Sequence, residues 1–293
     1  MSAEKAHLSL PTQVKIQPIP GTFVAEVLGL ETVPRPGDPL RDTLLNGLYE
    51  HMVLVFRNVS LSPPQQAEFT SIFGEPEVPA NIYQGHPQAP CVLVLTNEGR
   101  ENVDYKTQTM YWHTESSFFA RPALATILNS QVLPSTGGDT MFVDMRTAYD
   151  TLPEEMKRRL KGLKARHSYV FRMIDITTRR MSADYAKSLL DKIPDVFHPV
   201  VRIHQTTGRK ALFLNELCVD QIVGLPPTES EQLLKELYDH TLRPELIYRH
   251  KWRKGDLLVW DNCSLMHCVA DIPVHEPRIF HRSQTRGPIP IGD

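Results

Sequence analysis

Residues 246–285 read LIYRHKWRKGDLLVWDNCSLMHCVADIPVHEPRIFHRSQT, and this stretch decides the fold class. It contains three short segments typical of strands, at 246–252, 256–260 and 278–285, separated by turns that contain GD, DN or proline. Consecutive short strands favour an antiparallel sheet over the strand–helix alternation of a doubly wound parallel sheet. We therefore expect a mixed α+β fold, with a double-stranded β-helix (jelly-roll) core and helices around it.

The rest of the chain supplies the helices and the remaining strands. Apolar residues at helical spacing predict helices over 39–51, 64–73, 152–163, 182–192 and 228–241. Strands are expected at 52–59, 91–96, 123–133 and 140–143, and 199–215 reads as two strands joined by a tight turn at TTGRK. Because the sequence shows neither an internal repeat nor a low-complexity linker, we expect one domain over residues 1–293, with residues 1–14 as a flexible N-terminus.

The composition excludes several classes of protein. The 293 residues carry 34 acidic and 32 basic side chains, a net charge of −2, so a nucleic-acid or acidic-membrane partner is not expected. No apolar run reaches the roughly 18 residues that span a bilayer, and the N-terminus lacks a secretory signal. Four cysteines without CxxC spacing favour a reducing, cytoplasmic location, with Cys263 and Cys268 as small buried residues.

One His-x-Glu triplet, His113-Thr114-Glu115, is a candidate metal-binding motif. Chance alone would produce about 1.4 triplets of a histidine and an acidic residue at this spacing, so the spacing by itself carries no weight. In an extended segment, however, residues i and i+2 share a face, and both side chains could therefore reach one ion. The alternative is an exposed strand edge with a hydrogen-bonded histidine and a solvated glutamate.

A second cluster of polar residues lies in the C-terminal stretch. An extended chain from Arg278 to Arg282 places these two arginines on one face and His281 on the other. His275 lies in a proline-containing turn, where an exposed loop histidine is expected. His267 lies at the end of an apolar stretch, where its imidazole needs a hydrogen-bond partner or a metal.

Two imidazoles and one carboxylate form the facial triad of non-haem Fe(II) oxygenases, which leaves positions open for a cosubstrate and O₂. A 2-oxo acid bound to such an iron has a distal carboxylate, which a planar guanidinium binds well. The two arginines fit that role, although a solvated face of an edge strand would also explain them.

Several blocks in order make the sequence resemble the taurine/chlorophenoxyacetate dioxygenases of the TauD/TfdA family, from about Ile16 to Pro288. The blocks are IQPIPGTFVAEVLGL, HMVLVFRNVSLSPPQQAEFTSIFGE, YWHTESSF, LPSTGGDTMFVDMRTAYDTLP, HPVVRIHQTTGRKALFLNE, GDLLVWDN and RIFHR. The resemblance implies a dioxygenase that uses Fe(II), 2-oxoglutarate and O₂ and releases succinate and CO₂. It also implies the iron ligands, which would be His113, Glu115 and His267.

The resemblance assigns further roles in the same pocket. Arg278 would bind the carboxylate of 2-oxoglutarate with help from Thr140, and Arg282 would bind the acidic group of the primary substrate. Two departures stand out: Glu115 replaces the usual aspartate, and the block after FGE reads PEVPANIY where taurine enzymes have a sulfonate-binding histidine. Taurine itself is therefore not the expected substrate.

We expect the enzyme to oxidise, by default to hydroxylate, a C–H bond of a small anionic substrate, and relatives suggest a homo-oligomer. Desaturation, ring closure or cleavage remain alternative outcomes, because the cofactor determines the chemistry and the protein chiefly controls positioning. Tyr169 and Phe171, on one face of a predicted strand, are candidates for the apolar substrate wall together with Tyr111 and Phe118. Two other classes remain open: a catalytically silent jelly-roll binding protein and a zinc hydrolase.

Overall fold

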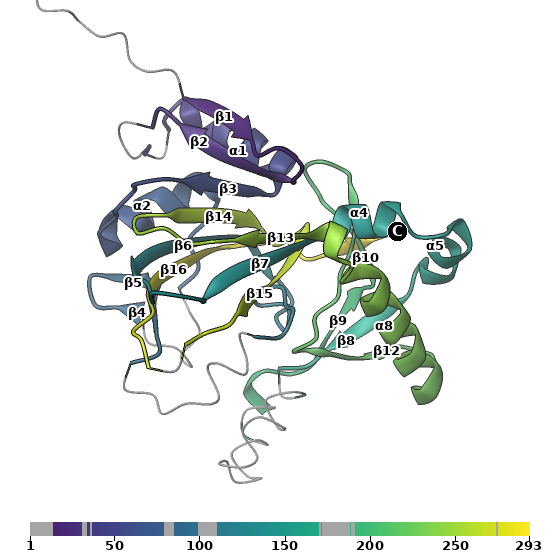
Figure 1. The fold of residues 1–293 in the computed structure, drawn as a ribbon. Coiled ribbons are helices and arrows are strands. Elements are labelled where there is room, and N and C mark those ends of the chain that lie inside the picture. Colours follow the sequence, from purple (N-terminus) through teal and green to yellow (C-terminus); the bar gives the residue numbers. More distant parts are fainter. Residues whose placement is uncertain are drawn as a thin grey trace, which may run out of the picture.

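The computed structural model describes most of the chain. The described residues are 14–30, 34–35, 37–78, 85–98, 110–169, 171, 188, 191–273 and 275–293. They form a mixed α and β structure with many more strands than helices (Figure 1). Within these residues, no helix combines the length and apolar character needed to cross a membrane.

An eight-stranded sheet forms the centre of the molecule, in the order β1-β2-β3-β14-β6-β16-β5-β4. The neighbours pair antiparallel, except for β2 with β3, which are parallel. The strands are β1 (Lys15–Pro18), β2 (Val24–Leu28), β3 (Val53–Phe56), β4 (Gly85–His86), β5 (Ala89–Thr96), β6 (Ala123–Val132), β14 (Leu257–Asp261) and β16 (Ile279–Arg286).

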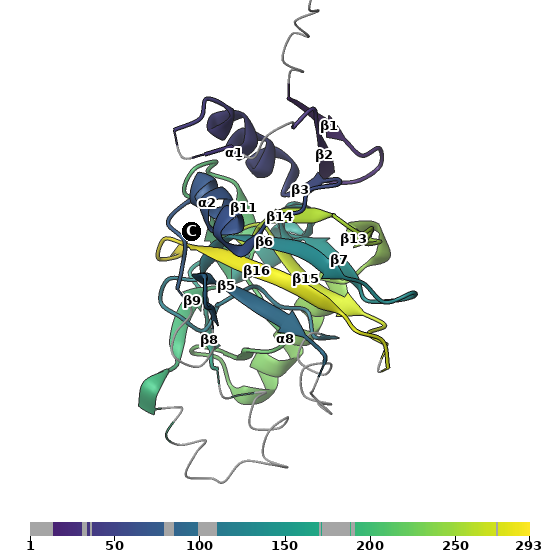
Figure 2. The same cartoon turned by 90° about the vertical axis from the view of Figure 1, so that its left-hand side faces the viewer.

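Two helices, α1 (Leu40–His51) and α2 (Pro63–Phe73), cover one face of this sheet (Figure 2). In β14, Leu257 and Val259 pack toward these helices, so the alternate residues Leu258 and Trp260 face the other way. Ser62 and Gln65 form a capping box that fixes the start of α2.

A second, three-stranded sheet, in the order β13-β7-β15, faces the other side of the large sheet. Its strands are β7 (Asp139–Asp144), β13 (Ile247–His250) and β15 (Leu265–Ala270). Phe142 and Leu265 from this sheet share one buried cluster with Trp260 and Phe280 from the large sheet. The space between the two sheets is therefore a packed core, and one end of it holds the polar site described below.

The remaining elements form a third body beside the two sheets (Figure 1). It comprises the small sheets β12-β8-β9 and β11-β10-β17 with the helices that pack on them. The elements are α4 (Met145–Asp150), α5 (Glu154–Leu160), β8 (Lys164–His167), β9 (Val196–Pro199), β10 (Val201–Ile203), β11 (Lys210–Leu212), β12 (Val219–Ile222), α8 (Pro227–Thr241), the 3-10 helix η1 (Pro244–Leu246) and β17 (Ile291–Gly292).

Most predicted elements are present within one or two residues of their expected ends. The three C-terminal strands are β13, β14 and β16, and the predicted hairpin at 199–215 is β10 paired antiparallel with β11. The helix predicted at 152–163 is shorter, because α5 begins only after Pro153. The helix predicted at 182–192 and the N-terminal segment 1–14 lie almost wholly outside the described residues.

Candidate metal centre

Three buried or half-buried ligand groups meet at one end of the inter-sheet core. Ligand atoms of His113, Glu115 and His267 all lie within 4.8 Å of one another. The backbones of the two histidines form an isolated antiparallel bridge, with reciprocal N–H to O distances of 2.9 and 2.8 Å. The Glu115 carboxylate lies 3.4 Å from His267 Nε2. Residues far apart in the sequence thus form one compact cluster.

The hydrogen bond of the His113 ring determines which of its nitrogens faces the cluster. His113 Nδ1 donates to the carbonyl of Tyr111 at 2.8 Å, since a carbonyl only accepts, and this leaves Nε2 with its lone pair. Burial lowers the pKa of His113 to about 4, so its imidazole is neutral at neutral pH. His267 Nδ1 is buried and has no hydrogen-bond partner among the described residues.

The turn that carries the glutamate is tied to the third body of the molecule. Asn215 donates from Nδ2 to the Thr114 carbonyl at 3.1 Å and to Ser117 Oγ at 2.7 Å. Glu216 Oε2 accepts the Trp112 N–H at 2.8 Å, and the Glu216 N–H donates to the Trp112 carbonyl at 2.9 Å. These two residues hold both ends of the turn.

Two further contacts complete this support. His198 Nε2 donates to the Phe119 carbonyl at 3.0 Å, and Thr114 Oγ1 donates to the Leu265 carbonyl at 3.0 Å.

Sequence reasoning missed His198 and the pair Asn215 and Glu216. The signal available was the abrupt change from apolar to polar residues at the end of ALFLNE.

Arg282 lies beside the glutamate. Its NH1 nitrogen donates to both Glu115 oxygens, at 2.9 and 3.0 Å. Burial alone would raise the pKa of the Glu115 carboxyl, but Arg282 and then the two imidazoles outweigh it, and the pKa falls far below its usual range. Glu115 is therefore an ionised carboxylate inside the protein, as a cation ligand must be.

Arg278 lies deeper on the same face, at 1% exposure. Its guanidinium stacks over the Phe280 ring at 4.1 Å and approaches the Gly138 carbonyl at 3.3 Å. Thr140 Oγ1, also buried, accepts from Trp252 Nε1 at 3.0 Å. Because Trp252 packs on Phe280 at 4.7 Å, the threonine and the arginine are connected through one set of side-chain contacts.

The structure decides between the alternatives that the sequence left open. The exposed-edge interpretation of the triplet is wrong, since Glu115 is only 7% exposed. The edge-strand interpretation of the arginines is also wrong, because β16 lies between β5 and β6. His281 lies on the opposite face near His86, and His275 is exposed, both as predicted.

The shared strand face predicted for Tyr169 and Phe171 is wrong. Strand β8 ends at His167, Tyr169 lies in a bend, and Phe171 is helical, because the chain turns where continued alternation was assumed. Tyr169 nevertheless packs against Phe118 at 4.7 Å, three residues beyond Glu115. Tyr169 therefore contacts an aromatic residue of the segment that carries Glu115.

A second buried group of ligand types is formed by His204, Asp261 and Cys263. His204 Nδ1 accepts the backbone N–H groups of Thr206 and Thr207 at 3.2 and 3.1 Å, so the ring proton is on Nε2. This Nε2–H faces Asp261 Oδ2 at 3.6 Å and offers no lone pair. Both contacts argue against a cation in this second group.

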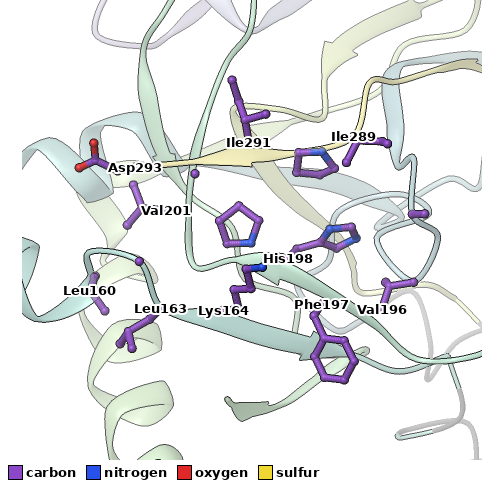
Figure 3. Close-up of a pocket in the computed structure, with 15 residues that line it drawn as sticks. Leu160, Leu163, Lys164, Val196, Phe197, His198, Val201, Ile289, Ile291 and Asp293 are labelled. Carbon is purple, nitrogen blue, oxygen red and sulfur yellow. The ribbon is translucent and has the colours of Figure 1, made fainter. Parts of the chain in front are cut away.

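A cavity lies elsewhere, between β8, β9 and the C-terminal residues (Figure 3). Its volume is about 610 Å³, and it is lined largely by apolar side chains such as Leu163, Phe197 and Ile291. Asp293 at its rim pairs with Lys210 at 2.6 Å. Because none of the His/Glu/His residues lines this cavity, it is not part of the candidate centre.

Comparisons with known proteins agree with this geometry. The family described as "Taurine catabolism dioxygenase TauD, TfdA family" matches residues 15–284. The chain is 34% identical to the alpha-ketoglutarate-dependent 2,4-dichlorophenoxyacetate dioxygenase of Burkholderia sp. (strain RASC), over 90% of this chain and 92% of that protein. It is also 34% identical to the (S)-phenoxypropionate/alpha-ketoglutarate-dioxygenase of Sphingobium herbicidovorans, with coverages of 93% and 94%.

Solved structures lead to the same group. A putative alpha-ketoglutarate-dependent taurine dioxygenase from Burkholderia xenovorans superimposes with a TM-score of 0.80 at 25% identity, covering 96% of this chain and 95% of the other. The structure of AAD-2 in complex with Mn(II) and N-oxalylglycine gives 0.78 at 28% identity, covering 96% and 100%.

Fold, site and comparisons together define the class as the 2-oxoglutarate-dependent dioxygenases, which use Fe(II), 2-oxoglutarate and O₂. Within that class, this chain belongs to the TauD/TfdA family.

Proposed function

We propose that His113, Glu115 and His267 bind Fe(II), that Arg278 and Thr140 bind 2-oxoglutarate, and that Arg282 binds the acidic group of the primary substrate. The observation that carries this proposal is the buried, ionised Glu115 within 4.8 Å of two imidazoles. Arg282 and the two imidazoles already keep this carboxylate ionised, and the carboxylate together with the imidazole nitrogens is a donor set that fits a divalent ion.

The individual atoms fit an iron ion in this position. The hydrogen bond to Tyr111 leaves His113 Nε2 available, and the carbonyl holds the ring orientation as in other metal-binding histidines. The extra methylene of glutamate is accommodated because Arg282 and the tethered turn fix the carboxylate position. Glu115 therefore supports metal binding and does not indicate a silent scaffold.

When bound, iron and 2-oxoglutarate supply the oxidation, in which O₂ is consumed, CO₂ and succinate are released, and a substrate C–H bond is hydroxylated by default. The protein positions the reactants and balances their charge. Arg278, stacked on Phe280, offers a buried cation for the distal carboxylate of the cosubstrate. Arg282, whose NH1 contacts Glu115, offers a second cation for the substrate anion.

The substrate class we propose is a small organic acid with an apolar part. The Arg282 guanidinium supports the acidic group, and the Phe118 ring, which packs on Tyr169 and follows Glu115 by three residues, supports the apolar part. Similar proteins are named for phenoxyacetates, phenoxypropionates and sulfate esters, all of which carry an anionic group. Ring closure or desaturation after the first oxidation remains an alternative outcome for this chain.

We further propose that the two facing sheets form a double-stranded β-helix (jelly-roll) core and that residues 1–293 are one domain. The buried cluster shared by both sheets supports this. We also propose a homo-oligomer in the cytoplasm without nucleic-acid or membrane partners, and the net charge of −2 supports the absence of these polyanionic partners.

The test is succinate release from 2-oxoglutarate, measured with a panel of small acids under air and under argon. We expect one or more acids to increase oxygen-dependent succinate formation, and Arg282→Met to abolish that increase. If succinate never depends on oxygen, the proposed function is wrong.

A further inference from the structure

Residues 75–77 run antiparallel beside the end of β16, next to the proposed metal centre. Pro76 and Thr285 form an antiparallel bridge, flanked by a Glu77 N–H to Gln284 carbonyl bond of 2.8 Å and an Arg286 N–H to Glu75 carbonyl bond of 2.9 Å. Glu77 therefore lies directly opposite Gln284. Opposite residues of an antiparallel pair point to the same side, so these two side chains share a face.

That face is the one that carries Arg282. Residues 282 and 284 are two apart on the strand and point the same way. Ser283 points to the other side, where its hydroxyl lies 2.7 Å from Thr70 Oγ1 on α2. Gln284 Oε1 lies 3.5 Å from Ser116 Oγ, in the residue directly after Glu115. Glu77 and Gln284 thus extend the polar wall beyond Arg282.

Each of these three side chains has a buried polar atom with no hydrogen-bond partner among the described residues. The atoms are Arg282 Nε, Gln284 Nε2 and Glu77 Oε2. Arg282 Nε and Gln284 Nε2 are donors, and the Glu77 carboxyl oxygen can accept. Buried polar groups are almost always satisfied, so an unpaired set on one face beside a reaction centre favours a bound ligand that pairs with them.

We propose that Arg282, Gln284 and Glu77 form one substrate subsite, which selects acids that carry an O–H or N–H donor next to the acid group. The anion binds Arg282 and Gln284, and the neighbouring donor binds Glu77. This inference rests on the proposed function and deepens it, because it defines the substrate class more narrowly than a small anion.

The surroundings of Glu77 agree with this role. Burial raises the pKa of its carboxyl, Arg286 and Arg282 lower it, and Glu115 raises it, so the carboxyl lies within the field of the site. Glu77 also lies in the block after FGE, where this sequence departs from the taurine enzymes. A carboxyl in that block disfavours a bare second anion and favours a hydrogen-bond donor.

The experiment uses the full chain, loaded anaerobically with Fe(II) and saturating 2-oxoglutarate, which should show a weak visible charge-transfer band. The probes are matched monocarboxylic pairs, such as 3-phenyllactate with 3-phenylpropanoate, and binding is read as a change in that band. We expect the hydroxy acid of at least one pair to bind about tenfold more tightly, the effect of one buried hydrogen bond.

Substitutions of Glu77 and Gln284 separate binding of the neighbouring donor from binding of the anion. Glu77→Met should reduce the tenfold preference to less than about twofold, whereas Glu77→Gln should retain most of it because the amide oxygen still accepts. Gln284→Leu should weaken both members of the pair by about the same factor, since it removes a donor to the shared anion. The 2-oxoglutarate affinity of each variant reports whether the pocket is intact.

The inference is overturned if no hydroxy acid binds more tightly than its deoxy counterpart, or if Glu77→Met leaves the preference unchanged. Failure of the proposed function looks different, because the charge-transfer band would then be missing from the wild-type protein before any probe is added.

Discussion

Two groups of buried or half-buried side chains in this protein contain residues of metal-binding types and support opposite conclusions. His113, Glu115 and His267 surround one point at the end of the inter-sheet core, and His204, Asp261 and Cys263 surround another. In the first group, the His113 ring donates through Nδ1 to a carbonyl, which leaves a lone pair facing its neighbours. In the second, the His204 ring accepts two backbone N–H groups and presents a proton.

The carboxylate of the second group, and the arginine beside its thiol, also argue against a metal there. Asp261 is already satisfied by its own turn, through the Cys263 N–H at 2.8 Å and the Ser264 hydroxyl at 2.5 Å. Arg202 donates to Cys263 Sγ at 3.0 Å and so places a positive charge beside the thiol. Residue type and proximity are therefore insufficient to define a metal site, and the orientation of one ring decides it.

The largest expected effect comes from removing the carboxylate of the first group. Glu115→Ala should weaken Mn(II) or Fe(II) binding by about 100-fold or more and abolish succinate formation, because two imidazoles alone bind these hard ions poorly. Isothermal titration with Mn(II) measures the loss. Unchanged affinity would mean that the two groups do not differ as described.

The matched change in the second group should act on stability and not on metal binding. Asp261→Asn removes the charge that faces His204 and that accepts from the 263–264 turn, and we expect a loss of about 3 kcal/mol in the free energy of unfolding. Mn(II) stoichiometry should remain that of the wild type. A lower stoichiometry in a folded variant would place a metal in the second group.

The histidines of the two groups should also differ in how they make the stability of the protein depend on pH. The pKa of His113 falls from 6.5 in the unfolded chain to about 4 in the folded metal-free protein. Between these values the unfolded chain binds a proton that the folded protein does not, so stability decreases as the pH falls through this window, by about 1.4 kcal/mol per pH unit. Burial also lowers the pKa of His204, but Asp261 counteracts this.

Urea unfolding of the metal-free protein at pH 7, 6 and 5 measures these slopes. His113→Asn should reduce the slope of the unfolding free energy against pH by nearly the amount of one proton, about 1.4 kcal/mol per pH unit. His204→Asn should reduce this slope by less. An equal reduction in both variants would contradict the environments assigned to the two rings.

The smallest effect is expected at Cys263. Burial raises the pKa of this thiol to about 12, so it is neutral and contributes one weak contact to Arg202. Cys263→Ala should cost about 1 kcal/mol in thermal unfolding and leave Mn(II) affinity unchanged. A large loss of stability would show that the thiol contributes more than this single contact.

The fold was largely predictable where local patterns determine it. The strands at β13, β14 and β16 follow from alternation and turn residues, and α1 follows from its leucine spacing. The pairing of residues 75–77 with β16 was not predictable, since it depends on a long-range contact that no local pattern encodes. Continued alternation past His167 was wrongly assumed because the chain turns there.

The site was predictable to a similar degree. Strand geometry placed Arg278 and Arg282 on one face, and family resemblance brought His113, Glu115 and His267 together. The sequence could not reveal that Arg282 pairs with Glu115, because Arg282 lies on β16 and Glu115 lies in a turn 167 residues earlier in the chain. It also could not distinguish His204 from His113, since each tautomer depends on the local backbone conformation. The His113 ring meets a carbonyl two residues earlier, and the His204 ring meets N–H groups two and three residues later.

The most direct test of the central claim is a crystal structure of the protein soaked with Mn(II) and N-oxalylglycine, with anomalous scattering recorded for manganese. The account predicts a strong anomalous peak bounded by His113, Glu115 and His267, and none beside His204, Asp261 and Cys263. A peak at the second group, or a saturated crystal without a peak at the first, would contradict it.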